Sequence, residues 1–364
     1  MSHLLTSTSV LHQVFEPSDD EYHEPPADAD RFWTETNWWS LNVPERRLGI
    51  WLHCQYHPLR GTATWRVFAW DPRGSDPGRL AYYKRLDEVP MPTPGEGELP
   101  DLRDITFPAG GYSVKVLKPT LDYHVTYGDQ EVGFAVDFEH RSLHEPRRFP
   151  AGEAPFMQSP HFDQLGRIEG EITLHGERIP VDCYSVRDRT WGPRGGAYAA
   201  SRKKEHLAGQ HDVRNPGGPA WRQVERERGR GRIDYIFGHA DADTGFLSFV
   251  RPQDGPASGR SPLNAGYLLK NGEIQPLDKT KSWMKNYRDP GTGWNAHMEV
   301  LLTDVTGRSA EVEGFSVAHM SEHGTSSNAL FRWEMDGKVA WGEDQDGWKP
   351  DHWRKMMSAL RQVR

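Results

Sequence analysis

The sequence has few of the features that mark several common protein classes. It contains 2 cysteines in 364 residues, Cys54 and Cys183, which are too few and too far apart for a disulfide framework. Hydrophobic residues make up 36% of the chain. No apolar run approaches the roughly 18 to 20 residues that span a bilayer. The opening MSHLLTSTSVLHQVF has no basic lead and no long apolar core, so we expect no signal peptide. These absences predict a cytoplasmic protein that is not integral to a membrane.

The chain also lacks an excess of positive charge and the common cofactor motifs. Its 44 basic and 52 acidic residues give a net charge of −8, which does not favour a nucleic-acid partner. There is no phosphate loop or dinucleotide fingerprint, and GFSVA (314–318) lacks the second glycine of a nucleophile elbow. The histidine pairs in HCQYH (53–57) and HMSEH (319–323) come without a clear third ligand. We therefore expect no cofactor and no metal.

Aromatic residues and a period of two are what the sequence has instead. There are 14 Trp, 14 Phe and 12 Tyr, which supply large surfaces for burial. Partly alternating β-branched and aromatic residues predict strands along most of the chain. His175-Gly176 is the expected hairpin turn within 166–186. Helical spacing is confined to a short segment, 349–363. The expected fold is all-β with a short C-terminal helix.

The length suits two domains of moderate size. Segments 87–104 and 143–160 are rich in proline and predict loops, and the second of them is the expected domain boundary. We therefore expect one β domain over 1–150 and a second over 151–364. The second domain would carry a long insertion, 201–232, and the C-terminal helix. Two all-β halves of similar size indicate a duplicated barrel architecture.

The most unusual motif is RDRTWG, in which Asp188 stands between Arg187 and Arg189. Two flanking arginines lower the pKa of a carboxyl group, and this would make Asp188 part of a structural ion-pair clasp. Neighbouring residues of a strand point to opposite faces, however, so the two arginines share a face that Asp188 does not. In an aromatic barrel interior Asp188 would be a proton donor. The residues alone leave both interpretations open.

The segment SPHFDQLGRIEG (159–170) precedes this motif by one hairpin. Its His161 and Asp163 have the same strand parity, and a hairpin would bring His161 to the same end of the barrel as Asp188. A histidine beside a carboxylic acid can tune it or relay its proton. The alternative is a surface histidine, of which a chain with 17 histidines has several.

With these residues in view, the chain resembles the lipocalin-like superfamily that includes carotenoid 1,2-hydratases and fungal decalin-forming Diels–Alderases, and within it a bacterial branch of two-domain proteins. The resemblance lies in HFDQLGRIEGEITLHGERIPVDCYSVRDRTWGPR (161–194), with support from 37–54, 301–317 and 334–345. It implies two lipocalin- or calycin-like β-barrels or sandwiches side by side, with a ligand pocket in or between them.

The resemblance also implies site residues. In the hydratases a histidine lies on the strand before an aspartate that is thought to protonate an alkene, and the matching positions are His161 and Asp188. The aromatic neighbours of those two residues in the hydratases are replaced here by Asp163 and Val186. Tyr184 and Trp191 lie close by in the sequence and are the expected aromatic partners. Further candidates for contact with substrate, at strand ends, are Arg167, Gln164, Glu343 and Asp344.

The function expected from these observations is a cofactor-independent enzyme that protonates a carbon–carbon double bond of a large apolar, isoprenoid substrate. Asp188 would be the general acid, His161 would orient or reprotonate it, and Trp191 and Tyr184 would shield the cation. Water capture would give a hydratase, and internal capture or proton loss a cyclase or isomerase.

Two alternatives stay open. One is a lipid- or terpenoid-binding protein without chemistry, and the other is a pericyclase that only folds a polyene. In each case the partner is a hydrophobic small molecule, and a homodimer is compatible with the pattern.

Overall fold

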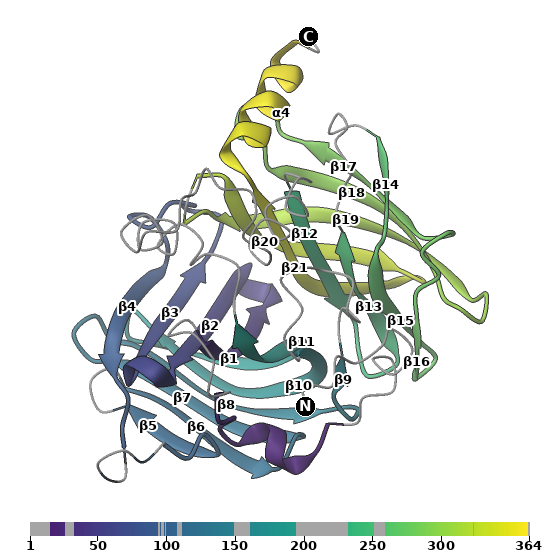
Figure 1. Ribbon diagram of the computed structural model, residues 1–364. Helices are drawn as coiled ribbons and strands as arrows, with labels where there is room; N and C mark the ends of the chain where they lie inside the picture. The colour runs from purple at the N-terminus through teal and green to yellow at the C-terminus, as the bar shows by residue number, and fades with distance from the viewer. Residues whose placement is uncertain are drawn as a thin grey trace, which may run out of the picture.

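The computed structural model describes residues 15–25, 33–93, 95, 98, 100–107, 111–148, 161–193, 232–250, 259–322 and 324–362. These residues form two curled antiparallel sheets and one C-terminal helix, α4 (Pro350–Gln362) (Figure 1). Short 3-10 turns lie at η1 (Pro17–Asp20), η2 (Pro44–Arg46) and η3 (Pro58–Arg60). Among the described residues, no helix is both long enough and apolar enough to cross a membrane.

The first sheet contains the strands of the N-terminal half and the long hairpin that follows them. In sheet order its strands are β4 (Tyr82–Pro90), β3 (Thr62–Trp70), β2 (Leu48–His57), β1 (Trp33–Val43), β11 (Glu177–Pro193), β10 (His161–Leu174), β8 (Phe134–Ser142), β7 (Asp122–Asp129), β6 (Tyr112–Lys118) and β5 (Asp104–Phe107), and β9 (Arg147–Arg148) pairs with β10 beside this path. The hairpin of β10 and β11 turns at His175 and Gly176, both with positive φ, as the sequence predicts.

The second sheet contains the remaining strands. In sheet order they are β14 (Arg260–Pro262), β17 (Trp283–Arg288), β18 (Asn295–Thr303), β19 (Ser309–Met320), β20 (Ser326–Met335), β21 (Lys338–Trp348), β12 (Arg232–His239), β13 (Thr244–Val250), β15 (Ala265–Lys270) and β16 (Glu273–Pro276). Figure 1 shows this sheet in green and yellow beside the purple and teal strands of the first.

Alternation along the strands gives each sheet an inner and an outer face. Inside the first sheet, Trp39, Tyr56 and Phe138 belong to one large buried cluster, and inside the second sheet Phe246 and Trp333 belong to another. Part of each outer face is also buried, where the two sheets pack against each other. A third cluster joins the two sheets, and its buried members are Trp38, Leu165, Val186, Phe237, Leu247, Phe249, Tyr267 and Leu269. We call this layer between the sheets the seam.

The predicted all-β class, two-domain organisation and C-terminal helix are confirmed. The sequence analysis placed the division of the chain at residue 150, after a proline-rich loop. The strand pairing assigns β10 and β11 to the first sheet, because β10 pairs with β8 and β11 pairs with β1. The change of sheet therefore falls between residues 193 and 232, and nearly all of the predicted 201–232 insertion lies outside the described residues. Strand β4 extends to Pro90 and so runs into segment 87–104, which was predicted to be a loop.

Candidate functional site

A cluster of polar side chains lies where β10 and β11 face the seam. The antiparallel register places Asp163 directly opposite Asp188 and His161 directly opposite Thr190, so all four residues share one face. His161 Nε2 lies 2.9 Å from Asp163 Oδ2, and His161 Nδ1 lies 2.6 Å from Thr190 Oγ1. One ligand atom from each of His161, Asp163 and Asp188 falls within 4.8 Å of the others. The hairpin thus brings His161 and Asp188 together, as the sequence analysis proposed.

The second sheet completes this cluster. Tyr235 of β12 donates its hydroxyl hydrogen to Asp163 Oδ1 over 2.8 Å. Burial, and then the charge of Asp163, raises the pKa of Tyr235 well above its usual value, so the phenol remains a neutral donor. Trp38 of β1 lies opposite Asp188, and its ring centroid is 6.1 Å from that of Tyr235 and 6.2 Å from that of Phe237. Asp188 therefore faces an aromatic layer between two sheets.

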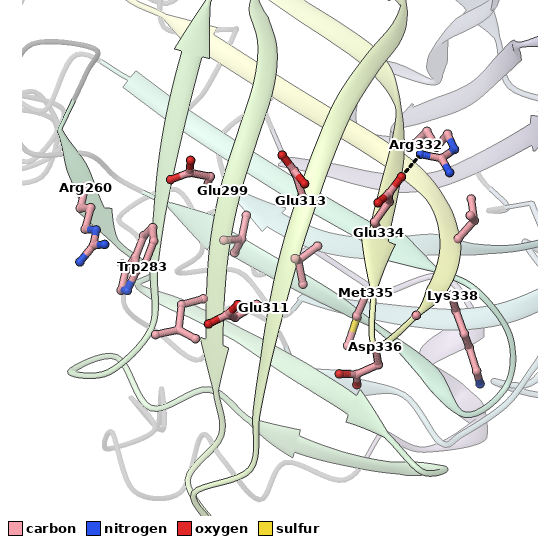
Figure 2. Close-up of a pocket in the computed structure, with 15 residues that line it drawn as sticks. Arg260, Trp283, Glu299, Glu311, Glu313, Arg332, Glu334, Met335, Asp336 and Lys338 are labelled. Carbon is pink, nitrogen blue, oxygen red and sulfur yellow. Dashed lines mark hydrogen bonds and ion pairs between the residues drawn. The ribbon is translucent and has the colours of Figure 1, made fainter.

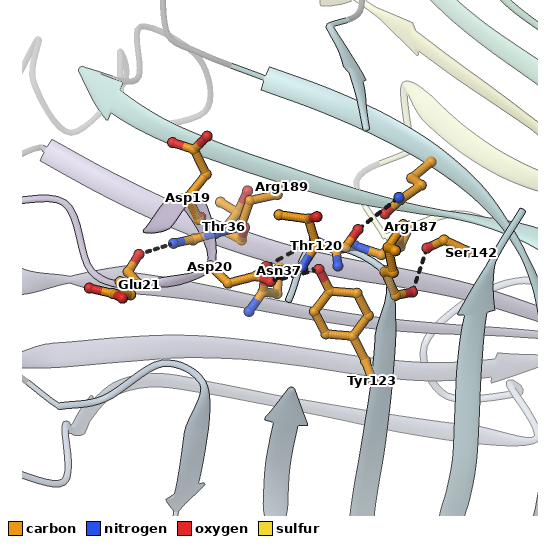
Figure 3. Close-up of polar contacts among 12 residues, drawn as sticks. Asp19, Asp20, Glu21, Thr36, Asn37, Thr120, Tyr123, Ser142, Arg187 and Arg189 are labelled. Atoms are coloured by element: carbon orange, nitrogen blue, oxygen red, sulfur yellow. Dashed lines mark hydrogen bonds and ion pairs between the residues drawn. The ribbon is translucent and has the colours of Figure 1, made fainter. Parts of the chain in front are cut away.

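Asp188 does not face the interior of a barrel, because that direction belongs to its two arginine neighbours. Arg187 is fully buried inside the first sheet, with its guanidinium carbon 3.9 Å from the ring centroid of Tyr123. Arg189 forms a buried ion pair with Glu35. Figure 3 shows the two arginines on this inner side, where Asp20 accepts a hydrogen bond from Tyr123 over 2.8 Å. The ion-pair clasp considered from the sequence is thus formed by the two arginines with Glu35 and Asp20. Asp188 lies on the opposite face of β11.

The two predicted aromatic partners of Asp188 separate onto different faces. Trp191 lies three residues after Asp188, an odd spacing, so it points to the inner side with the arginines. There its ring stacks on His23 with centroids 4.0 Å apart, and it cannot shield a cation at Asp188. Tyr184 has the parity of Asp188, is half-buried and packs against the aromatic cluster of the seam.

Gln164 and Arg167 do not join the cluster either. Gln164 is buried on the inner face and donates its amide hydrogens to the carbonyl oxygens of Thr120 and His144, each over 2.8 Å. Arg167 is 41% exposed and forms an ion pair with Asp182 over 2.9 Å. Both contacts are structural.

The two carboxyl candidates of β21 lie on opposite faces of the second sheet. Glu343 is buried in the seam, where its Oε1 accepts a hydrogen bond from Ser40 of the first sheet and its Oε2 accepts one from Gln345 over 2.9 Å. Burial raises the pKa of Glu343 to about 7. Asp344 points into the second sheet's core, where burial, and next the charge of Asp234, raises the pKa of Asp344 well above its usual value. Asp344 is therefore remote from the seam.

Three residues of the seam were not singled out from the sequence, namely Trp38, Ser40 and Tyr235. Trp38 is one of six tryptophans between residues 33 and 70, and nothing in the sequence distinguishes it from the others. Tyr235 lies in the alternating segment RIDYIFGH (232–239), and that alternation predicts that Tyr235 and Phe237 share a face. The local pattern gives no sign that this face meets Asp163.

The same cluster offers a set of metal-binding groups. One imidazole nitrogen and two carboxylates, from His161, Asp163 and Asp188, are ligands that a divalent transition metal accepts. The expectation of no metal was based on the histidine pairs 53–57 and 319–323 and did not consider this set. Its members come from two strands that are adjacent only after folding.

A groove of about 790 Å³ lies elsewhere, along the second sheet. Glu299, Glu313 and Glu334 stand opposite one another on β18, β19 and β20, and Figure 2 shows them with the ion pair of Arg332 and Glu334. None of the residues of the seam cluster lines this groove. It is an acidic, open surface and offers no apolar enclosure.

Two proteins of known structure, one of them in two structures, resemble the chain in structure. Kievitone hydratase from Nectria haematococca is 9% identical with a TM-score of 0.49, and the match covers 92% of each chain. CghA with Sch210972 is 11% identical with a TM-score of 0.48, covering 87% of this chain and 89% of that one. CghA alone is 11% identical with a TM-score of 0.49, covering 87% and 88%. No curated protein matches the sequence.

A family model described as "Domain of unknown function (DUF7064)" matches residues 16–207, slightly more than half of the chain. This range includes every strand of the first sheet and the cluster residues of β10 and β11. The chain belongs to this DUF7064 family.

Proposed function

We propose that the protein is a cofactor-independent enzyme that protonates a carbon–carbon double bond of an apolar small molecule held at the seam. The observation that carries the proposal is the pairing of Asp188 with Asp163 in an aromatic layer, with His161 and Tyr235 fixed on Asp163. Such a constellation has the parts of a general acid and its orienting partners.

Each group has a distinct role in this chemistry. Asp163 accepts a hydrogen bond from the Tyr235 hydroxyl group and lies within hydrogen-bond distance of His161. It is therefore the hydrogen-bond acceptor of the cluster. Two carboxylates this close repel each other when both are charged, so Asp188 is the group placed to carry a proton. The Tyr235 and Phe237 rings around Trp38 offer π faces to a cation. His161, within reach of Thr190, returns a proton to the cluster after turnover.

The substrate class follows from the surroundings of Asp188 and from the superfamily resemblance. The seam consists of packed apolar and aromatic side chains, a composition that suits contact with a large isoprenoid better than with a polar metabolite. Protonation of a polyene there leads to hydration, cyclisation or isomerisation, depending on what quenches the cation. The reaction class is therefore a hydro-lyase or an isomerase.

The test is incubation with geraniol, farnesol, geranylgeraniol and squalene in deuterated water, followed by mass spectrometry. A product with deuterium on carbon supports the proposal. Asp188→Asn should lower its formation by on the order of 100-fold or more. Asp182→Asn, an exposed aspartate of the same strand and parity, is the matched control and should keep wild-type turnover.

Other outcomes point to the alternatives. A new product without deuterium indicates a pericyclase, since folding a polyene needs no solvent proton. Retention of an unchanged ligand, equally in wild type and in Asp188→Asn, indicates a carrier. Full activity of Asp188→Asn refutes the role of this residue.

A second candidate is a metal-dependent enzyme built on the same three side chains, because their ligand atoms converge within 4.8 Å. It predicts stoichiometric binding of Zn²⁺ or Mn²⁺ by calorimetry, abolished by Asp163→Asn, and loss of turnover after dialysis against a chelator. Turnover that survives the chelator rejects this candidate.

A further inference from the structure

A second carboxyl group faces the seam from the opposite sheet. Glu343 is 1% exposed, and its two oxygens accept hydrogen bonds from Ser40 and Gln345. Gln345 stands opposite Tyr235 in the β12–β21 pairing, and Tyr235 holds Asp163. The Glu343 carboxyl thus lies on the same layer as the Asp188 cluster and belongs to the other domain.

The strand geometry gives the spacing between these two groups. Ser40 follows Trp38 by two residues on β1, and Trp38 is the residue opposite Asp188. Two residues along a strand span roughly 7 Å. The contact of Glu343 with Ser40 therefore lies about that far along β1 from Trp38, the neighbour of the proposed acid on the next strand, with the aromatic cluster of Trp38 and Phe237 beside it.

The hydrogen-bond partners and the pairing partner of Glu343 are neutral, and the titratable side chain on the facing part of β2 is His53, opposite Trp38. Ser40 faces Glu343 from β1, Gln345 from β21 and Leu330 from the pairing position on β20, and none of these titrates. No charged side chain of the described residues shifts the pKa of Glu343, which burial raises to about 7. Asp346, on the inner face of the same strand, differs. Two arginines, Arg232 and Arg288, overcome its burial and hold its pKa below the usual value. Arginine thus neutralises the Asp346 carboxylate, whereas Glu343 makes no ion pair with the described residues.

We propose that Glu343 is the proton acceptor that ends the reaction begun by Asp188. This inference rests on the proposed function. The Asp188 carboxyl gives its proton to one alkene carbon, whose π electrons form the new C–H bond and leave a cation. The Glu343 carboxylate then removes a proton from a carbon next to the cationic centre, and that C–H electron pair becomes a new double bond. Substrate and product are isomers, and solvent returns the proton from Glu343 to the Asp188 cluster.

The separation of the two carboxyls indicates which reaction this is. A shift of one double bond would leave the cation close to Asp188, where the donor itself could take the proton back. Deprotonation beside Ser40, roughly 7 Å along β1 from Trp38, requires that the cationic centre moves along the substrate. Ring closure by an internal alkene moves it in this way. The substrate class is therefore a linear polyene, and the product is a cyclic alkene.

The experiment uses the full-length protein with geranylgeraniol in deuterated water. Mass spectrometry from pH 5.5 to 8.5 measures the ratio of two products: the cyclic alkene, which is an isomer of the substrate, and the additional alcohol, which has gained one water. Wild type should give mainly alkene with one deuterium per molecule. Glu343→Gln should lower alkene formation by on the order of 100-fold while water captures the cation, so that alcohol becomes the main product. Glu311→Gln, an exposed glutamate of the same sheet, should behave as wild type.

Ser40→Ala provides a second readout that a purely structural role of Glu343 would not move. It keeps the carboxyl group and removes a donor that lowers its pKa. Because the acceptor must be ionised, the pH at which alkene formation begins should move upward in this variant. This arm stands even if Glu343→Gln fails to fold.

The outcomes separate this proposal from the one on which it rests. An inactive Asp188→Asn together with an unchanged alkene-to-alcohol ratio in Glu343→Gln overturns the role of Glu343 alone. An unshifted pH profile in Ser40→Ala overturns it as well. A wild type that forms no product, or an Asp188→Asn that remains fully active, overturns both.

Discussion

The buried Glu343 carboxyl makes the stability of the protein depend on pH in a way that one substitution should remove. Its pKa is about 7 in the folded protein, against 4.5 for an unperturbed glutamate. A folded-state pKa above the unfolded value means that the folded protein binds the proton more tightly. The resulting stabilisation is complete below about pH 4.5 and is lost as the pH rises through about 7.

The size of the effect follows from the shift. A difference of about 2.5 pH units corresponds to about 3 kcal/mol in full. Between pH 5.5 and pH 8 the linkage relation gives a loss of about 2 kcal/mol. For a domain of this size that is roughly 4 to 8 °C in Tm. Glu343→Gln cannot ionise, so its stability should lack this component of the pH dependence.

The assay is chemical and thermal unfolding of wild type, Glu343→Gln and Glu311→Gln at pH 5.5 and pH 8. Other groups titrate as well, so the quantity of interest is the change in the difference between each variant and wild type. Glu311→Gln should follow wild type at both pH values, and Glu343→Gln should gain about 2 kcal/mol relative to wild type at pH 8. If the wild-type and Glu343→Gln curves stay parallel, the carboxyl is not desolvated in the folded protein and the reasoning fails.

Three further predictions concern the packing around the site. Glu35→Gln leaves the buried Arg189 without its anion and should lower the free energy of unfolding by about 3 to 5 kcal/mol. The double variant with Arg189→Met should largely restore this stability. A single variant as stable as wild type would contradict the buried ion pair. Gly342→Ala would bring a Cβ to 2.0 Å from a backbone oxygen of β12 and should lower Tm clearly. The control Gly347→Ala, whose Cβ would have no atom closer than 4.0 Å, should leave Tm unchanged. Equal Tm values for the two variants would show that the strands can separate. Tyr235→Phe removes the donor to the Asp163 carboxylate and should reduce kcat by about 10- to 100-fold with little change in KM; an effect on KM alone would assign Tyr235 to substrate binding.

Much of the fold could be predicted because alternation is a local property. The long hairpin with its turn at His175 and Gly176 and the C-terminal helix over 349–363 are both visible in short windows of sequence. The domain boundary was harder to predict. The proline-rich segment 143–160 resembles a linker, and only the pairing of β10 with β8 and of β11 with β1 shows that the hairpin completes the first sheet.

The candidate site could be predicted only in part, for the same reason. Strand parity separates Asp188 from its arginine neighbours, and the same rule applied to Trp191 would have placed it on the arginine side. Strand parity does not show which other surface packs against a given face of a strand. Tyr235 reaches Asp163 across 72 positions, and Ser40 reaches Glu343 across 303. Contacts at such separations depend on how two sheets pack, and no local pattern encodes that packing.

The side chains of β11 lie in two different environments, and this restricts insertions and deletions in the strand. Its odd-numbered side chains Arg187 and Arg189 fill the first core, and its even-numbered Asp188 faces the seam. Inserting or deleting one residue just before Arg187 would exchange the two sets, moving both guanidinium groups into the apolar layer and the carboxylate into the aromatic core. Variation in length is therefore expected at the exposed turn of His175 and Gly176, where an added residue leaves the register of the motif intact. A substitution in β11 changes one side chain in one of the two environments, but a register shift by one residue disrupts the core and the site together.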